Sequence, residues 1–178
     1  MDRGLTRALV FGRFQPFHKG HLSLIKWAFD NLGIDEIVVL VGMASENYTP
    51  RNPFTAGERI EMIRLSFLDE GIPLDKLITA TIQTLETNFG CVHYVLSYVP
   101  RIDFILARNP IIVKIFRDAG LNVVKPPLFN RDEWRGDRIR ALMARRDPRW
   151  RSAVTPSTGE FIESIGGVER VAELYSSD

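Results

Sequence analysis

The sequence predicts an α/β domain in which about five parallel strands are covered by helices on both faces. The first observation is that short apolar runs alternate with helical patterns along the chain, an order typical of parallel sheets. The second is that the run EIVVLVG at 36–42 is apolar almost throughout, which indicates a strand buried on both faces. The third is length, because 178 residues with 45% hydrophobic and 25% charged residues suit one globular domain. We therefore expect a single domain spanning 1–178.

The first half of the chain is expected to alternate two strands with two helices. They cover 7–12 (strand), 20–32 (helix), 36–42 (strand) and 55–70 (helix). Leu24, Ala28 and Leu32 recur along one face of the first helix, as in an amphipathic helix. Thr55 and Glu58 have the spacing of a capping box, which marks the start of the second.

The second half continues the alternation and ends in helices. It is expected to contain strands at 77–82, 102–107 and 122–125, and helices at 92–99, 110–119, 135–146 and 158–174. Pro110 at the first helical position and Gly120 beyond the last one frame the helix at 110–119. Sheets of this kind bind ligands at the carboxyl ends of their strands, where the strand order switches. Functional residues are therefore expected in the loops that follow the strands.

Composition excludes several classes of protein. The net charge is +1, so no global charge favours nucleic acid or an anionic membrane as partner. A single cysteine excludes a disulfide framework and a cysteine-cluster metal site. No apolar run approaches the roughly 18 residues of a membrane span, and the N-terminus is too charged for a signal peptide. We expect a soluble, cytoplasmic protein.

Arginine is concentrated near the end of the chain. Between Arg131 and Arg151 there are eight arginines against four acidic residues. The guanidinium group forms two parallel hydrogen bonds to a phosphate or carboxylate, which lysine cannot do. This stretch is a local candidate for anion binding.

Two histidines stand at the mouth of the first helix, in the sequence His18-Lys19-Gly20-His21. Their spacing places both imidazoles on one face of a helix whose first N–H groups are free, and a glycine between them lets a phosphate approach the backbone. A zinc site would need a third and a fourth ligand, for which the chain offers only one further histidine, His93, and one cysteine, Cys91. The other alternative is a pair of structural histidines that cap the helix. The pattern favours phosphate binding over both alternatives.

The run GRFQPFHKGH at 12–21 resembles the signature of the HxGH nucleotidyltransferase superfamily, and more narrowly that of the archaeal-type nicotinamide-mononucleotide adenylyltransferases. The resemblance continues through RNPFTAGER at 51–59 and GGVER at 166–170. It also includes Asn88, Asn109-Pro110, Pro126-Pro127-Leu128-Phe129 and Arg131. The resemblance implies a Rossmann-like fold and adenylyl transfer from ATP to nicotinamide mononucleotide, which gives NAD and pyrophosphate.

The resemblance also implies roles for particular residues. His18, His21 and Arg140 would be catalytic. ATP would be bound by Gly12, Arg13, Phe14, His18, Gly20, His21, Arg131, Gly136, Asp137, Arg138 and Arg140, with helices from about residue 135 onward completing the site. The acceptor would be bound by Arg51, Asn88, Phe89, Cys91 and Asn109. Mg²⁺ would be carried by the ATP phosphates, with no metal site of the protein's own. A homo-oligomer, commonly a hexamer, is implied as well.

Two departures from the family pattern leave alternatives open. The second motif of the family reads roughly Ser-Gly-Thr-x-x-Arg, whereas residues 135–140 are RGDRIR. Asp137 would repel a triphosphate unless Arg135 or Arg138 neutralises it. Cys91 stands where the family has a tryptophan that stacks on the nicotinamide ring. The alternatives are a nucleotidyltransferase with another phosphorylated acceptor, and an ATP-binding protein of this fold without turnover.

Overall fold

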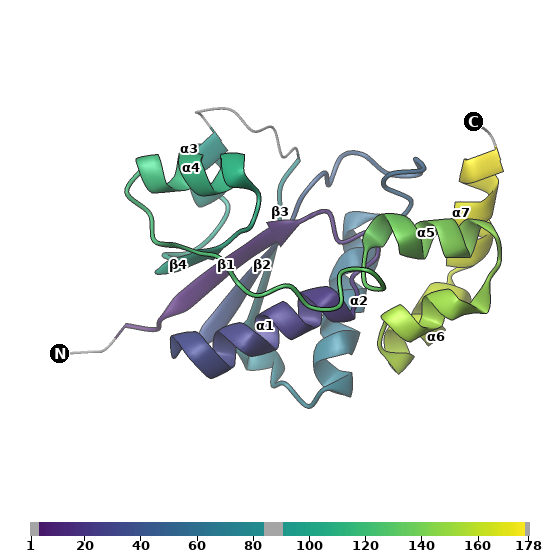
Figure 1. The fold of residues 1–178 in the computed structure, drawn as a ribbon, viewed down its shortest axis with the longest axis horizontal. Coiled ribbons are helices and arrows are strands. Elements are labelled where there is room, and N and C mark those ends of the chain that lie inside the picture. Colours follow the sequence, from purple (N-terminus) through teal and green to yellow (C-terminus); the bar gives the residue numbers. More distant parts are fainter. Residues whose placement is uncertain (1–3, 84–90, 177–178) are drawn as a thin grey trace.

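The computed structural model describes residues 4–83 and 91–176 and contains a five-stranded parallel sheet. Its strands are β1 (Arg7–Gly12), β2 (Glu36–Val41), β3 (Leu77–Thr81), β4 (Phe104–Leu106) and β5 (Val123–Val124). Their order in the sheet is β3-β2-β1-β4-β5 (Figure 1). The predicted fold class is confirmed, and the strand order switches between β1 and β4, where a ligand site is expected.

Helices cover both faces of the sheet, and the strands alternate their side chains between them. The covering helices are α1 (Lys19–Leu32), α2 (Ala56–Asp69), α3 (Cys91–Leu96) and α4 (Pro110–Asp118). Ala8 and Val10 of β1 pack in one apolar cluster with α1 and α2, while Leu9 packs in another with α3 and α4. This alternation is the period of two that a strand imposes on its side chains.

Three helices after the last strand form a group beside α1 and α2 (Figure 1). They are α5 (Gly136–Ala144), α6 (Pro156–Ser164) and α7 (Gly167–Ser176), with the 3₁₀ helix η2 (Pro148–Ala153) between α5 and α6. Ile139, Ile162 and Val171, one from each helix, are completely buried in the same core cluster as α1 and α2. The group is therefore packed onto the domain and is part of it.

The single helix predicted at 158–174 is wrong, because the chain breaks there into α6 and α7. Gly166 lies between them with φ at +65°, a left-handed conformation that glycine adopts without strain. A Cβ atom on Gly167 would lie 2.8 Å from the backbone oxygen of Ile162 and 2.9 Å from the ring of Phe54. Tight packing of α7 against α6 and Phe54 therefore requires glycine at this position.

The other elements lie within a few residues of their predicted bounds. β4 and β5 are the shortest, and Pro126-Pro127 follow β5, where proline has no N–H to continue the pairing. A further 3₁₀ helix, η1 (Leu74–Lys76), precedes β3. Thr55 and Glu58 form the predicted capping box at the start of α2. Within the described residues, no helix is both long enough and apolar enough to span a membrane.

Candidate active site

The loop between β1 and α1 places two imidazoles at the start of α1. His18 is the N-cap residue, and its backbone N–H donates to Nδ1 of His21 at 3.3 Å. The two rings stack with centroids 3.6 Å apart. A Cβ atom on Gly20 would lie 3.0 Å from Nδ1 of His18, so glycine between the histidines leaves room for the imidazole. The pattern His-x-Gly-His thus produces a compact pair at a helix N-terminus.

Both imidazoles are neutral at pH 7. Burial lowers the pKa of His18 from 6.5 to about 4. Burial also lowers the pKa of His21 well below its usual range, and the nearby charge of His18 lowers it further. The pair can therefore donate N–H hydrogen bonds to an anion without first carrying a charge.

Two buried nitrogen atoms beside this loop lack hydrogen-bond partners within the described part of the chain. They are Nδ1 of His18 and Nη1 of Arg13. Leaving a buried polar group unsatisfied costs about 1–3 kcal/mol, and an anion bound here would relieve that cost. Together with the N–H groups of the first turn of α1, they form a place where a phosphate can bind.

These groups lie in a pocket of about 810 Å³ at the switch point of the sheet. A pocket of this size is suited to a nucleotide. It is lined by Arg13, Phe14, Gln15, His18, Gly20, His21, Leu24, Arg108, Asn109, Pro110, Pro127, Leu128, Phe129, Arg131, Trp134, Arg135, Gly136, Asp137 and Arg140. The lining therefore joins the loop after β1, the loop after β4, the segment after β5 and the start of α5.

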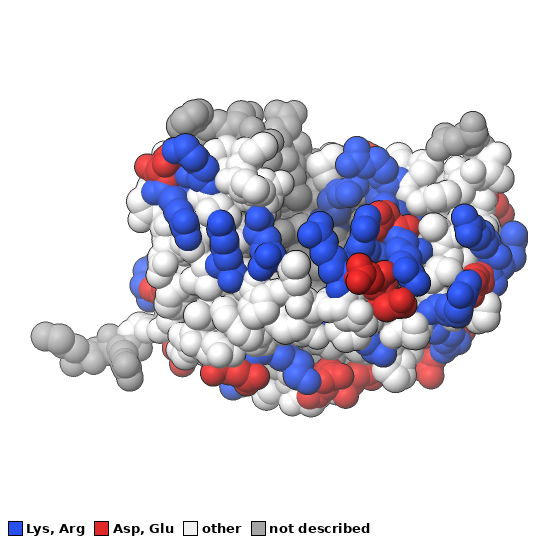
Figure 2. Space-filling model, viewed as in Figure 1, with Lys and Arg blue, Asp and Glu red and all other residues white. Residues whose placement is uncertain are grey.

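The pocket is strongly basic. Five arginines line it, and among the described lining residues Asp137 is the only acid. Basic side chains extend in a band across this face of the molecule (Figure 2). Burial lowers the pKa of Arg13, and the neighbouring charges of Arg51 and Arg140 lower it further. The concentration of positive charge in a nearly neutral protein indicates a polyanionic ligand.

Arg140 lines this pocket, with 6% of its surface exposed. Its Nε donates to the backbone oxygen of Pro50 at 3.1 Å, and its Nη1 donates to that of Gln15 at 2.8 Å. A Cβ atom on Gly136 would lie 3.1 Å from this Nη1 and 3.2 Å from the oxygen of Gln15. The glycine of the altered motif is thus required for the position of Arg140.

The altered motif neutralises its own carboxylate. Nε and Nη2 of Arg135 donate to the two oxygens of Asp137 at 3.1 and 2.5 Å. The hydrogen bonds from Arg135 hold the pKa of Asp137 below its usual range. Arg138 pairs with Glu133 instead, at 3.1 Å. Of the two arginines that could compensate for Asp137, the structure selects Arg135.

The predicted site residues do not all line the pocket. Those that do are Arg13, Phe14, His18, Gly20, His21, Asn109, Arg131, Gly136, Asp137 and Arg140. Gly12 and Arg138 are absent from the lining. Arg138 forms an ion pair with Glu133 instead. Arg51 is exposed at the surface and is also absent from the lining, although its charge contributes to the lowered pKa of Arg13.

On the acceptor side, Cys91 is 7% exposed and packs in the apolar cluster between the sheet, α3 and α4. It does not line the pocket, so the structure does not bring Cys91 together with Asn109, the other predicted acceptor residue described on this side. Asn88 and Phe89 lie outside the described residues. Sequence reasoning missed Gln15, Leu24 and Arg108, of which Arg108 follows β4 and could have been found from the rule that strand ends carry ligand contacts.

Acid is expected to destabilise the protein between pH 6.5 and about 4, because the unfolded chain binds the proton of His18 more readily than the folded chain in this interval. Stability from this group is present above the unfolded pKa and is lost as the pH falls. The free energy of unfolding should fall by about 3 kcal/mol over the interval through His18 alone. Urea unfolding at a series of pH values measures this loss. A His18→Gln variant should lose less, and an identical pH dependence of the two proteins would contradict the assignment.

This chain is similar to known proteins over most of its length. The family model described as "Cytidylyltransferase-like" matches residues 9–147. A protein of Aeropyrum pernix named "Uncharacterized protein" is 74% identical over 172 residues, which are 97% of this chain and 99% of the relative. A protein of Ignicoccus hospitalis named "Nicotinamide-nucleotide adenylyltransferase" is 42% identical over 172 residues, again 97% of this chain and 99% of the relative.

A solved structure supports the fold. A bifunctional NMN adenylyltransferase/ADP ribose pyrophosphatase from Francisella tularensis, complexed with AMP and a Mn ion, superposes with a TM-score of 0.73 at 17% identity. The alignment covers 97% of this chain and 52% of that one, so this chain spans about half of its length. Because the family model matches more than half of the chain and named relatives match nearly all of it, the chain belongs to the cytidylyltransferase-like family, together with the archaeal proteins named nicotinamide-nucleotide adenylyltransferase.

Proposed function

We propose that this protein transfers the adenylyl group of ATP to nicotinamide mononucleotide, with NAD and pyrophosphate as products. The observation that carries the proposal is the histidine pair at the start of α1, where Nδ1 of His18 and Nη1 of Arg13 are buried without partners in the described residues. The name shared by relatives of 36–42% identity over nearly their whole length supports the choice of acceptor.

The reaction needs positioned charge more than a covalent catalyst. An oxygen of the acceptor phosphate forms a bond to the α-phosphorus of ATP, and the bond from that phosphorus to the bridging oxygen breaks, so that pyrophosphate leaves. His18 and His21 donate hydrogen bonds to the α-phosphate, where negative charge develops. Arg13 and Arg140 hold the β- and γ-phosphates, which leave together. Arg51 and Asn109 bind the acceptor.

We further propose that the metal ion arrives with ATP. No group of three or more His, Cys, Asp or Glu side chains that could hold a metal occurs among the described residues. The carboxylate of Asp137 in the pocket is already paired with Arg135. Mg²⁺ prefers nucleotide phosphates and water as ligands, and when bound it would neutralise charge on the leaving group. The solved relative contains Mn in its complex with AMP, which supports the use of a divalent ion.

Three further points belong to the same proposal. The helices from α5 onward complete the ATP site, since the start of α5 contributes Arg135, Gly136, Asp137 and Arg140 to the pocket. The protein is a homo-oligomer, a hexamer by its family resemblance, which sedimentation can measure. Its reaction takes place in the cytoplasm.

A second candidate function is adenylyl transfer to another phosphorylated acceptor, and Cys91 is the observation that favours it. A buried thiol provides no aromatic face for a nicotinamide ring, so the ring must stack elsewhere or be replaced by another group. The relatives of 74% and 50% identity carry names that assign no acceptor.

Pyrophosphate release from ATP is expected with nicotinamide mononucleotide as acceptor, and NAD should be recovered as the product. The other acceptors to be compared in the same assay are nicotinate mononucleotide and phosphate monoesters without an aromatic base. Cys91→Ala is expected to leave the KM for the acceptor within about twofold, because the thiol does not line the pocket. Turnover with a different acceptor only would establish the second candidate. ATP binding without any pyrophosphate release would indicate a nucleotide-binding protein without turnover.

A further inference from the structure

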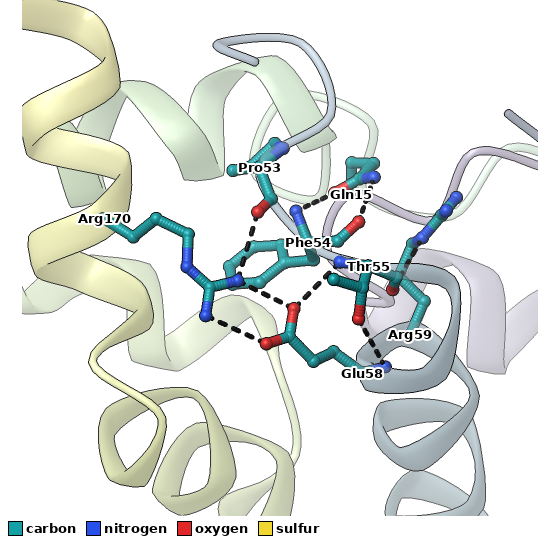
Figure 3. Close-up of polar contacts among 7 residues, drawn as sticks. All are labelled: Gln15, Pro53, Phe54, Thr55, Glu58, Arg59 and Arg170. Atoms are coloured by element: carbon teal, nitrogen blue, oxygen red, sulfur yellow. Dashed lines mark hydrogen bonds and ion pairs between the residues drawn. The ribbon is translucent and has the colours of Figure 1, made fainter. Parts of the chain in front are cut away.

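Arg170 of α7 is anchored on the segment that leads into α2 (Figure 3). Its Nη1 donates to Oε2 of Glu58 at 2.7 Å and to the backbone oxygen of Pro53 at 3.2 Å, and its Nη2 donates to Oε1 of Glu58 at 2.9 Å. Both charged side chains are largely buried, with 16% and 17% of their surfaces exposed. The guanidinium and the carboxylate thus form a largely buried, bidentate contact. Such a contact is stronger and more directional than an ion pair at the surface.

The same guanidinium also contacts the beginning of this segment. Its central carbon lies 4.8 Å from the centroid of the Tyr48 ring, within the range of a cation–π contact. Tyr48 and Pro53 stand on either side of Arg51, which is exposed at the surface. One side chain of α7 therefore contacts both ends of the stretch 48–53, which carries Arg51.

The stretch is connected from its other side to the nucleotide pocket. The side-chain amide of Gln15 donates to the backbone oxygen of Phe54 at 2.9 Å and accepts from its backbone N–H at 3.0 Å. Pro50 accepts from Nε of Arg140 at 3.1 Å. A shift of this stretch would consequently affect the positions of Gln15 and Arg140 in the pocket. Arg140 would still keep its second hydrogen bond, to the backbone oxygen of Gln15.

Electrostatic repulsion acts against this arrangement. The charge of Arg51 is close enough to lower the pKa of Arg13, after the larger effect of burial. The two like charges repel each other until bound phosphate groups neutralise them. Holding the backbone of this stretch in place would limit how far Arg51 can move away from the phosphate site.

We propose that Arg170 is a positioning residue that holds the stretch 48–53 so that Arg51 faces the phosphate of the acceptor. The proposal rests on the proposed function in one respect, namely that Arg51 binds the acceptor. Arg170 itself touches no substrate. Its removal should impair acceptor binding through Arg51 and leave the contacts of ATP with the histidine pair in place.

A double-mutant cycle with Arg51→Ala and Arg170→Met tests the proposal. Each single variant should raise the KM for nicotinamide mononucleotide roughly 10–100-fold, while kcat and the KM for ATP change by less than about threefold. The double variant should be no worse than Arg51→Ala, because the anchor has no further effect once Arg51 is gone. Multiplicative effects in the double variant, or an equal loss of kcat and of both affinities, would overturn the proposal.

Two variants separate positioning from stability. Arg151→Met is the matched control, since it removes an arginine–glutamate pair of 2.6 Å from the surface of the same group of helices, and it should leave both KM values unchanged. Arg170→Lys keeps the charge beside Glu58 but loses the two-point contact, so its KM for the acceptor should lie between those of wild type and Arg170→Met. It also replaces Arg170→Met if that variant fails to fold. Glu58 is unsuitable for the test, because its carboxylate also accepts from the backbone N–H of Thr55 at 2.8 Å and caps α2.

Hydrogen exchange distinguishes failure of this proposal from failure of the proposed function. The backbone N–H of Asn52 donates to the backbone and side-chain oxygens of Thr49, both at 3.1 Å. Its exchange should accelerate at least about tenfold in Arg170→Met and remain unchanged in Arg151→Met. This result does not depend on the acceptor. Wild-type protein that makes no NAD refutes the proposed function alone, whereas unchanged exchange at Asn52 refutes the role of Arg170.

Discussion

His18→Ala and His21→Ala are each expected to lower kcat for adenylyl transfer by roughly 10²-fold or more, which corresponds to the loss of one positioned donor to developing charge. The two imidazoles stack 3.6 Å apart at the start of α1, and Nδ1 of His18 is buried without a partner in the described residues. A water molecule that replaces either ring would have to be ordered anew in each catalytic cycle. Steady-state rates at saturating ATP and acceptor measure the effect.

The third histidine provides the control for this prediction. His93 is exposed on α3, so His93→Ala should retain the rate of wild-type protein. The folded state of both active-site variants should persist, because each change is confined to the start of α1, and His18→Ala also removes a buried nitrogen that has no partner in the described residues. A near-normal rate in either variant, or one equivalent of zinc in the purified protein, would show that the pair does not act on phosphate.

Arg140→Lys is expected to weaken ATP binding and to lower kcat, together by roughly 10–100-fold in kcat/KM for ATP. The guanidinium is buried, and Nε and Nη1 are both used on backbone oxygens that fix its plane. An ammonium group keeps the charge but cannot bridge Pro50 and Gln15 while it also faces a triphosphate. Calorimetric titration with ATP and steady-state kinetics with varied ATP check both parts.

Arg145→Lys, at the exposed end of the same helix, is the matched control and should leave the kinetics with ATP unchanged. If Arg140→Lys has the same kinetics as wild type, the role in binding the triphosphate passes to Arg135. In that case the Arg135–Asp137 pair must open when ATP binds, and Arg135→Ala should show the loss instead.

The sequence predicted the elements well because their signals are local. A run such as 36–42 needs no distant partner to be recognised as a buried strand, and the capping box of Thr55 and Glu58 lies within one helical turn. The prediction of one helix at 158–174 was wrong for a local reason, although the apolar pattern there is that of a continuous helix. Apolar residues repeat across the break, and only the conformation of Gly166 and the contacts of Gly167 separate α6 from α7.

The candidate site was predictable in part. The histidine pair and Arg140 follow from short motifs, and the pocket includes them. The acceptor side was less accessible to sequence reasoning, since Arg51 lies at the surface and Cys91 lies in the apolar core. A motif shows which residue types stand at which spacing, but it does not show which way an exposed side chain faces.

By itself the sequence determined a parallel α/β domain, a histidine pair at a helix N-terminus and a resemblance that runs the length of the chain. Only the tertiary structure decided which arginine neutralises Asp137, which buried nitrogens lack a hydrogen-bond partner within the described residues, and which segment Arg170 contacts. The physical reason is the range of the interactions. Periodicity and capping act over a few residues, whereas the Arg170–Glu58 pair joins positions 112 residues apart and exists only once the helices have packed.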